Sequence, residues 1–328
     1  MAERWFGFVS VCAVSVAVAF GIACQQQAPQ ETAPASSADA SRLERGRYLV
    51  ENVAHCFFCH SDVDWAAEGA PPKAGKAGAG TVFPDENLPF LVVASNITPD
   101  RETGAGEWSD EDFGRAIREG IGRDGRRLFP VMPYELYRGM SDQDLAAVIA
   151  YLRSMAAVRN ELPKTELPEP VKQALPPHQP LTQPVPPPDP SDQVKRGAYL
   201  AQLAECVACH TPMDATMQPI LSLAFAGGFD LKGPWGHLYS ANITPAASGI
   251  AHYDEALFLQ VMKTGNVGGR KLNSIMPWGY TRGMTDDDLK AVYAFLKTLP
   301  PVAHRMDNTE KASPCKLCGA VHGLGEDN

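Results

Sequence analysis

Apolar residues recur at helical spacing in several segments of this chain. In SRLERGRYLVENVA (41–54) they follow the three-to-four-residue period of a helix face, and the segment leads directly into a C-x-x-C pair. Three pairs of residues have the spacing of a helix-opening capping box: Ser109 with Asp112, Ser141 with Asp144, and Thr285 with Asp288. No long alternating pattern, as a half-buried strand would show, occurs anywhere. These patterns predict an all-α class with long loops.

The pattern occurs twice along the chain. RGRYLVENVAHCFFCH is matched by RGAYLAQLAECVACH, SNITP by ANITP, and VMPYELYRGMSDQDL by IMPWGYTRGMTDDDL. Because these matches keep their order and nearly constant separation, we expect one fold used twice, in domains at 41–162 and 191–305. Residues 163–190 between them hold 11 of the chain's 28 prolines. We expect this segment to form no helix and to run as an extended linker.

The first 24 residues predict export. Arg4 precedes an uncharged, largely apolar run from Trp5 to Cys24. Three alternatives fit: a cleaved export signal, an uncleaved anchor helix, or a lipoprotein signal ending at Cys24, where GIAC is similar to a lipobox. Residues 25–40 are polar and suit a flexible tether to a membrane. All three alternatives predict a periplasmic protein, with a membrane tether at the N-terminus in two of them.

Composition and charge narrow the function only slightly. The length of 328 residues suits two domains, and 45% hydrophobic residues are typical of a globular chain. The formal net charge of −9 argues against nucleic acid as a partner.

Two C-x-x-C pairs are followed at once by histidine. These are Cys56, Cys59 and His60 in the first copy, and Cys206, Cys209 and His210 in the second. Two thiols three residues apart on a helical turn can form thioethers with one porphyrin, and the adjacent imidazole can bind its iron. A zinc site would need two further ligands nearby, and neither copy supplies them. We therefore expect two covalently bound c-type haems.

Methionine is the expected second axial ligand. Met132 and Met276 recur in register ahead of proline, in a loop; Met140 and Met284 recur just before a helix cap, where they can pack as a hydrophobic staple. We therefore predict that Met132 and Met276 ligate iron. Arg126 with Arg270, and Arg138 with Arg282, are equally open as propionate ligands or as solvated surface residues.

The chain resembles the cytochrome c subunits of bacterial membrane-bound alcohol, aldehyde and gluconate dehydrogenases. The resemblance lies in four motifs that follow one another in each repeat: C-x-x-C-H, N-I-T-P, M-P-Y or M-P-W, and G-M-[ST]-D-x-D-L. The resemblance covers 41–162 and 191–305. It implies tandem cytochrome c domains that each enclose one haem, and it places the ligand methionine of M-P-Y at Met132 and, through M-P-W, at Met276. It also implies a dehydrogenase subunit with no catalytic site of its own. Such a subunit carries electrons from the dehydrogenase to a respiratory acceptor, either a terminal oxidase or a small cytochrome. The alternative is a di-haem enzyme of the peroxidase or thiosulfate dehydrogenase type.

A third pair, Cys315 and Cys318, lies in the polar tail 306–328 and lacks the adjacent histidine. We favour a local disulfide. The alternatives are a thiol pair that contacts a partner subunit and a metal site formed with His322, although that metal site would have three protein ligands where a structural zinc takes four.

Overall fold

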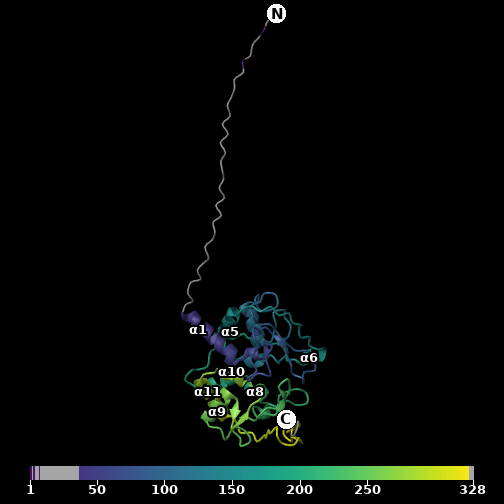
Figure 1. Cartoon of the computed structure of the whole chain (residues 1–328), viewed down its shortest axis with the longest axis vertical. Helices are drawn as coiled ribbons and strands as arrows, with labels where there is room; N and C mark the ends of the chain where they lie inside the picture. The colour runs from purple at the N-terminus through teal and green to yellow at the C-terminus, as the bar shows by residue number, and fades with distance from the viewer. Residues whose placement is uncertain (2, 4–6, 8–36, 325–328) are drawn as a thin grey trace. The chain divides into compact units, whose positions relative to one another are not determined.

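The computed structural model describes residues 1, 3, 7 and 37–324, and its contacts divide the chain into the units Met1–Ser36 and Ser37–Asn328. The predicted export segment 1–24 and most of the predicted tether 25–40 lie outside the described residues. Among the residues that the structure describes, no helix is long and apolar enough to cross a membrane. The helices and strands belong to the second unit (Figure 1).

The first repeat consists of short helices joined by long loops. Its elements are α1 (Ser37–Tyr48), the π-helical turn η1 (Leu49–Val53), α2 (Cys56–Cys59), β1 (Thr81–Val82), β2 (Val93–Ala94), α3 (Asp110–Glu119), α4 (Tyr134–Tyr137) and α5 (Asp142–Ser154). Helix α1 begins four residues before the predicted domain boundary at residue 41.

The second repeat has the same order of helices. Its elements are α7 (Gln193–Leu203), α8 (Cys206–Cys209), η2 (Leu221–Leu223), β3 (Asp230–Gly233), β4 (Gly236–Tyr239), α9 (Glu255–Thr264), β5 (Asn266–Val267), β6 (Arg270–Lys271), α10 (Trp278–Thr281) and α11 (Asp286–Thr298). The tail adds a hairpin of β7 (Ser313–Pro314) and β8 (Val321–His322).

The strands of the described residues form four separate two-stranded antiparallel sheets: β1 with β2, β3 with β4, β5 with β6, and β7 with β8. The all-α expectation did not include these sheets. Each strand has two to four residues, too few to show the alternation that identifies a strand from sequence.

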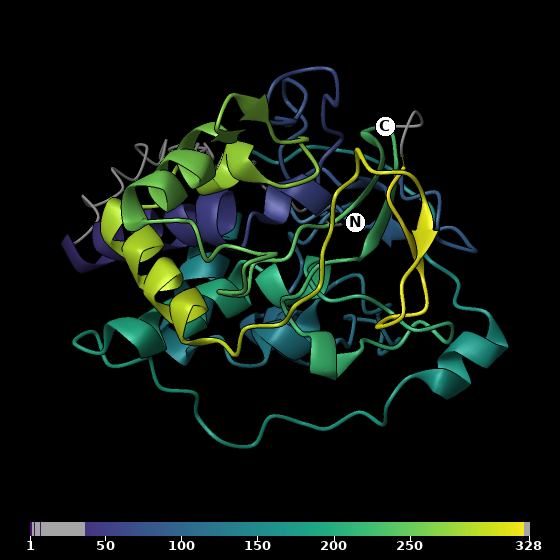
Figure 2. The same ribbon diagram turned by 90° about the horizontal axis from the view of Figure 1, so that it is seen from below.

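The linker contains a helix that the sequence pattern did not predict. Helix α6 (Glu169–Ala174) carries proline in its first turn. The prediction that 163–190 forms no helix is therefore wrong for these six residues. Proline is tolerated at a helix start because the first N–H groups have no partner within the helix. The rest of the linker is extended (Figure 2). It contacts the first repeat through hydrogen bonds, one of which runs from the Asp142 N–H to the Val185 carbonyl (2.9 Å).

In each repeat the first and last helices cross at a glycine. A Cβ atom on Gly46 of α1 would lie 2.0 Å from the Ala147 oxygen of α5, and one on Gly197 of α7 would lie 1.9 Å from the Ala291 oxygen of α11. Only glycine allows the two backbones to approach this closely.

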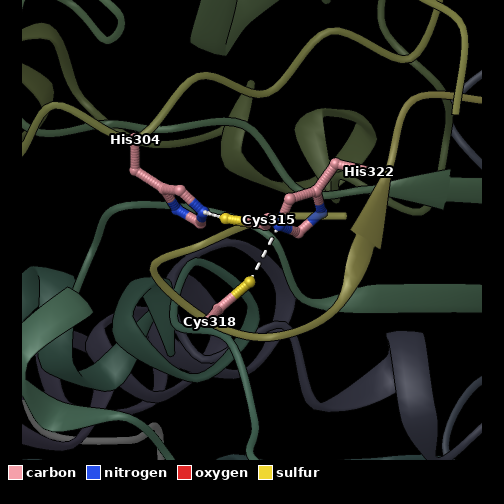
Figure 3. Close-up of side chains that lie close together, drawn as sticks. All are labelled: His304, Cys315, Cys318 and His322. Atoms are coloured by element: carbon pink, nitrogen blue, oxygen red, sulfur yellow. Dashed lines mark hydrogen bonds between the residues drawn. The ribbon is translucent and has the colours of Figure 1, made fainter. Parts of the chain in front are cut away.

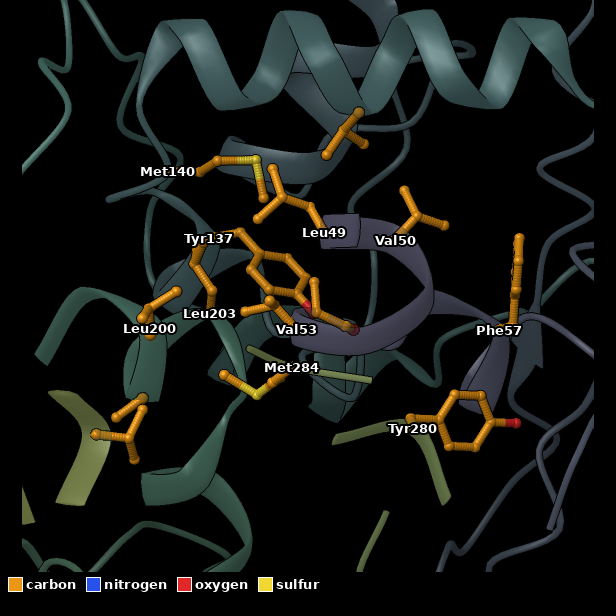
Figure 4. Packing of buried hydrophobic residues seen from close by; sticks show 14 of the residues in the cluster. Leu49, Val50, Val53, Phe57, Tyr137, Met140, Leu200, Leu203, Tyr280 and Met284 are labelled. Carbon is orange, nitrogen blue, oxygen red and sulfur yellow. The ribbon is translucent and has the colours of Figure 1, made fainter. Parts of the chain in front are cut away.

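The two repeats share one apolar core. Leu49, Val53, Tyr137 and Met140 of the first repeat and Leu200, Leu203, Tyr280 and Met284 of the second are buried in a single cluster (Figure 4). The attachment motifs are therefore carried by two repeats that pack directly against each other.

Polar contacts join the repeats in a symmetric exchange. The Tyr48 hydroxyl donates to the Asp288 carboxylate, and the equivalent Tyr199 hydroxyl donates to Asp144 (2.7 Å). Arg45 and Arg196 each bind the aspartate of their own repeat.

Because of these contacts, two of the three predicted capping boxes are incomplete. Ser109 and Asp112 form the complete box. At α5 and α11 the hydroxyls of Ser141 and Thr285 cap the helix. The two aspartates at the third position, however, bond to tyrosine and arginine. The prediction is therefore confirmed in full only for α3.

Candidate haem-binding sites

Each C-x-x-C pair forms one helical turn entered through a left-handed residue. His55 (φ 32°) precedes α2, and Glu205 (φ 58°) precedes α8. The N–H of the following histidine closes the turn on the first cysteine, from His60 to Cys56 (2.8 Å) and from His210 to Cys206 (3.0 Å). This geometry places both thiols and the start of the histidine side chain on one short turn, as covalent attachment of a haem requires.

Both histidines are oriented by a backbone carbonyl. Nδ1 of His60 lies 2.7 Å from the Ser95 oxygen, and Nδ1 of His210 lies 2.6 Å from the Ala241 oxygen. Nδ1 must carry the proton to donate there, so the lone pair is on Nε2 and is available to a metal. Burial lowers the pKa of both imidazoles, although each carbonyl contact acts in the opposite direction, and the neutral form is the one that ligates iron.

The residue after each of these carbonyls is the asparagine of the repeated N-I-T-P motif. Asn96 Oδ1 accepts from the N–H of Thr98 (3.0 Å) and from its hydroxyl (2.7 Å), while Nδ2 donates to the Val158 carbonyl (2.7 Å). Asn242 makes the same contacts with Thr244 and Val302. The motif thus ties the histidine-orienting loop to the segment that follows the last helix of each repeat.

A cavity of about 610 Å³ lies beside the first motif. Its walls include Cys56, Cys59, His60, Met132 and Arg126. The volume is that of a pocket for a large cofactor, and the wall carries two thiols, an imidazole with a free Nε2 and a thioether. The residues present therefore fit a c-type haem.

The two methionine pairs differ in burial. Met140 and Met284 are 2% and 1% exposed and belong to the core cluster that also contains Leu145 and Leu289, which is consistent with the predicted staple. Met132 is half-buried. Both Met132 and Met140 line the cavity, so the ligand role of Met132 stays a prediction, as does that of Met276.

The arginines of the first repeat that were considered as propionate ligands, Arg126 and Arg138, have different surroundings. Arg126 lines the cavity beside the first C-x-x-C-H motif. Arg138 donates to the Gln179 carbonyl of the linker (2.8 Å).

The half-buried carboxyl group of Glu205, close to both motifs, was missed from the sequence. Burial raises the pKa of all four attachment thiols, and the charge of Glu205 adds to the shift at each one. Cys209 contributes to the shift at Cys59 as well. Glu205 also accepts a hydrogen bond from the Tyr137 hydroxyl of the first repeat. The two attachment turns are therefore near neighbours, a relation that no sequence spacing reveals.

Two C-x-x-C-H turns with oriented histidines, one of them beside a haem-sized cavity, fit the class of c-type haem proteins. The chain belongs to the cytochrome c family, whose model matches residues 43–156 and 194–300. The expected tandem arrangement of two cytochrome c domains is confirmed by these two matches.

Relatives of named function support the predicted resemblance to dehydrogenase cytochromes. One of the subunits of nicotinate dehydrogenase from Pseudomonas putida is 38% identical over 231 residues, which are 63% of this chain and 17% of that protein. The fructose dehydrogenase cytochrome subunit of Gluconobacter japonicus is 29% identical over 313 residues, 92% of this chain and 61% of the relative. A diheme c-type cytochrome of Cereibacter sphaeroides is 27% identical over 281 residues, 80% of this chain and 87% of the relative. The chain thus spans less than two thirds of the first two relatives.

Proposed function

We propose that this chain is a periplasmic di-haem electron carrier that takes electrons from a dehydrogenase and delivers them to a respiratory acceptor. When bound, each haem iron supplies one-electron redox chemistry. The observation that carries the proposal is the proximity of the two attachment turns within one packed unit. The Tyr137 hydroxyl contacts both the Ala54 carbonyl, two residues before Cys56, and the Glu205 carboxylate, directly before Cys206. Electrons that enter at one site then have a short path to the other.

The chain's own residues suit this role. His60 and His210 are held by carbonyl oxygens, and the shared core fixes one repeat against the other. We assign Met132 and Met276 as the second axial ligands, because they are only partly buried, whereas Met140 and Met284 are 2% and 1% exposed within the core. Iron ligated on both faces transfers electrons and has no position for a substrate, which disfavours the alternative of a di-haem enzyme.

The upstream partner is proposed from the relatives. Several are cytochrome subunits of fructose, gluconate and alcohol dehydrogenases. We propose a dehydrogenase of this kind as the electron donor. The apolar run 5–24 supports export, with lipid attachment at Cys24 or a retained helix as the tether.

Intact mass and redox spectroscopy test the carrier function. We expect a mass increase equal to two haems and two low-spin spectra with Met–ferric absorbance in the far red. Met132→Ala and Met276→Ala should each remove about half of that absorbance and lower one potential, while Met140→Ala should leave the absorbance unchanged. A one-haem mass would contradict the proposal, and a high-spin haem in the wild-type protein would favour the enzyme alternative. Loss of the band in Met140→Ala but not in Met132→Ala would refute the ligand assignment.

A further inference from the structure

Four potential metal ligands converge on the tail. His304, Cys315, Cys318 and His322 each offer one ligand atom, and these atoms all lie within 4.8 Å of one another (Figure 3). Nε2 of His304 is 3.3 Å from Sγ of Cys315, and Nε2 of His322 is 2.9 Å from Sγ of Cys318. A tetrahedral zinc with two sulfur and two nitrogen ligands separates its ligand atoms by about 3.3 to 3.8 Å. The separations between the four ligand atoms are therefore close to those of a tetrahedral zinc site.

We infer that these four side chains bind one Zn²⁺ ion, which ties the tail to the second cytochrome domain. The fourth ligand, which the sequence pattern did not supply, is His304, in the segment between α11 and the hairpin. Two thiolates and two imidazoles form a closed tetrahedral set, the kind that holds a structural zinc and leaves no open position for catalysis.

The hairpin presents its two cysteines in a compact turn. The Cys315 N–H donates to the Ala320 carbonyl (2.7 Å), and the Gly319 N–H donates to the Cys315 carbonyl (3.0 Å), with Gly319 in the left-handed region at φ 77°. The Leu317 N–H points at Sγ of Cys315 (3.4 Å). Such a donor favours the thiolate, which is the form that binds a metal.

A role as metal ligands explains why the imidazoles of His304 and His322 are buried. His304 is 1% exposed and His322 is 7% exposed. Nδ1 of His304 lies 3.1 Å from the Ala226 carbonyl, which directs the lone pair of Nε2 at Cys315. Gly228 makes room for both rings, because a Cβ atom there would lie 2.9 Å from Cε1 of His304 and 3.1 Å from Cε1 of His322.

The first repeat provides an internal comparison for His304. Asn160 occupies the equivalent position after the last helix, and its Nδ2 donates to the Ala79 carbonyl (2.9 Å) as His304 donates to Ala226. An amide therefore suffices for the structural contact. The histidine of the second repeat adds a nitrogen lone pair that faces a cysteine, and only the second repeat is followed by the cysteine hairpin.

The site lies close to the second haem attachment turn. The Ala226 carbonyl that orients His304 precedes Gly227, whose N–H donates to the His210 carbonyl (2.8 Å). Asn242 of the N-I-T-P motif also donates to the His304 carbonyl (2.9 Å). A bound ion would thus stiffen the loop that supports His210, without taking part in electron transfer.

Metal analysis of the freshly purified, untagged full chain tests the inference. Zinc and iron per chain are measured by mass spectrometry in the wild-type protein, in His304→Asn and Cys318→Ser, and in Lys316→Ala as a control in the same turn. We expect one zinc per wild-type chain and per Lys316→Ala chain, and at least tenfold less in the two ligand variants, with haem iron unchanged. His304→Asn is the informative variant because asparagine reproduces the contact that Asn160 makes.

A second measurement does not depend on the variants. Wild-type protein grown with Co²⁺ should show the thiolate-to-cobalt charge transfer and tetrahedral ligand-field absorbance of a two-sulfur site in its difference spectrum against the zinc form. Three results would overturn the inference. They are wild-type protein without stoichiometric zinc, zinc retained in both ligand variants, and an intact mass 2 Da below that of the dithiol, which would establish a disulfide.

Discussion

The paired tyrosines between the repeats provide a quantitative prediction about how the two domains are held together. Tyr48 donates to Asp288 and accepts from the Thr285 N–H (3.2 Å), while Tyr199 donates to Asp144 and accepts from the Ser141 N–H (3.1 Å). Each hydroxyl therefore joins one repeat to the first turn of the last helix in the other. Replacing tyrosine with phenylalanine removes only this oxygen.

The size of the effect follows from the burial of the carboxylates. Asp288 and Asp144 are 3% and 5% exposed, so neither can replace the lost donor fully with water. A hydrogen bond to a charged group contributes about 1.5 to 3 kcal/mol. We expect Tyr48→Phe and Tyr199→Phe each to lower the free energy of unfolding by about 1.5 to 3 kcal/mol. The two losses should not be strictly additive in the double variant, because Arg45 binds Asp144 and also lies over the Tyr48 ring, so the two contacts share a neighbour.

Equilibrium unfolding in guanidinium chloride, followed by far-UV circular dichroism, measures these losses. Tyr151→Phe is the matched control. The Tyr151 hydroxyl also donates to a carboxylate, that of Glu51, but the two residues belong to the same repeat, and the Glu51 side chain is 33% exposed. We expect a loss in the control of at most about 1 kcal/mol, since exposed charged contacts are screened by water. If both inter-repeat variants lost no more than the control, the hydroxyls would not hold the repeats together.

Two further predictions concern single buried groups. Asn96→Ala should cost about 1 to 3 kcal/mol in unfolding experiments, because it leaves the buried Thr98 N–H without a partner, while the Val158 carbonyl keeps the Thr98 hydroxyl at 3.3 Å; a cost below about 1 kcal/mol would contradict this role of Asn96. Burial raises the pKa of Glu205 from 4.5 to about 7, against the opposing effect of the Tyr137 hydroxyl. The folded chain then keeps a proton that the unfolded chain releases, so stability should fall as pH rises from about 4.5 to about 7. Glu205→Gln should flatten that part of the stability profile, and an unchanged slope would assign it to another group.

The local elements were largely predictable, since they depend on neighbouring residues. Ser109 and Asp112 close the capping box as their spacing indicates. The short helix α6 was missed because proline was weighed as a helix breaker, although it is acceptable in a first turn.

Contacts between distant residues could not be predicted in the same way. Asp144 and Asp288 have the spacing of capping boxes, yet arginine and tyrosine side chains far away in sequence compete for their carboxylates. A bidentate arginine contact and a tyrosine hydroxyl stabilise a buried carboxylate more than one backbone N–H does. A comparison of the repeats argues against His304 as a ligand, because the first repeat has asparagine, Asn160, at the equivalent position. That argument excludes a ligand role shared by both repeats and says nothing of a role confined to one.

The residue before the first cysteine of each C-x-x-C-H motif shows which features can be inferred from the duplication and which cannot. His55 and Glu205 both have left-handed backbones that lead into the attachment turn, so the geometry is shared although the side chains differ. His55 is buried and its Nδ1 lies 3.0 Å from the Val53 carbonyl, within its own repeat. Glu205 instead reaches Tyr137 of the other repeat and adds a carboxyl group near all four attachment thiols. Positions that match between the repeats therefore supply the proposed haem ligands, whereas positions that differ, such as Glu205 and His304, make contacts that only the second repeat has.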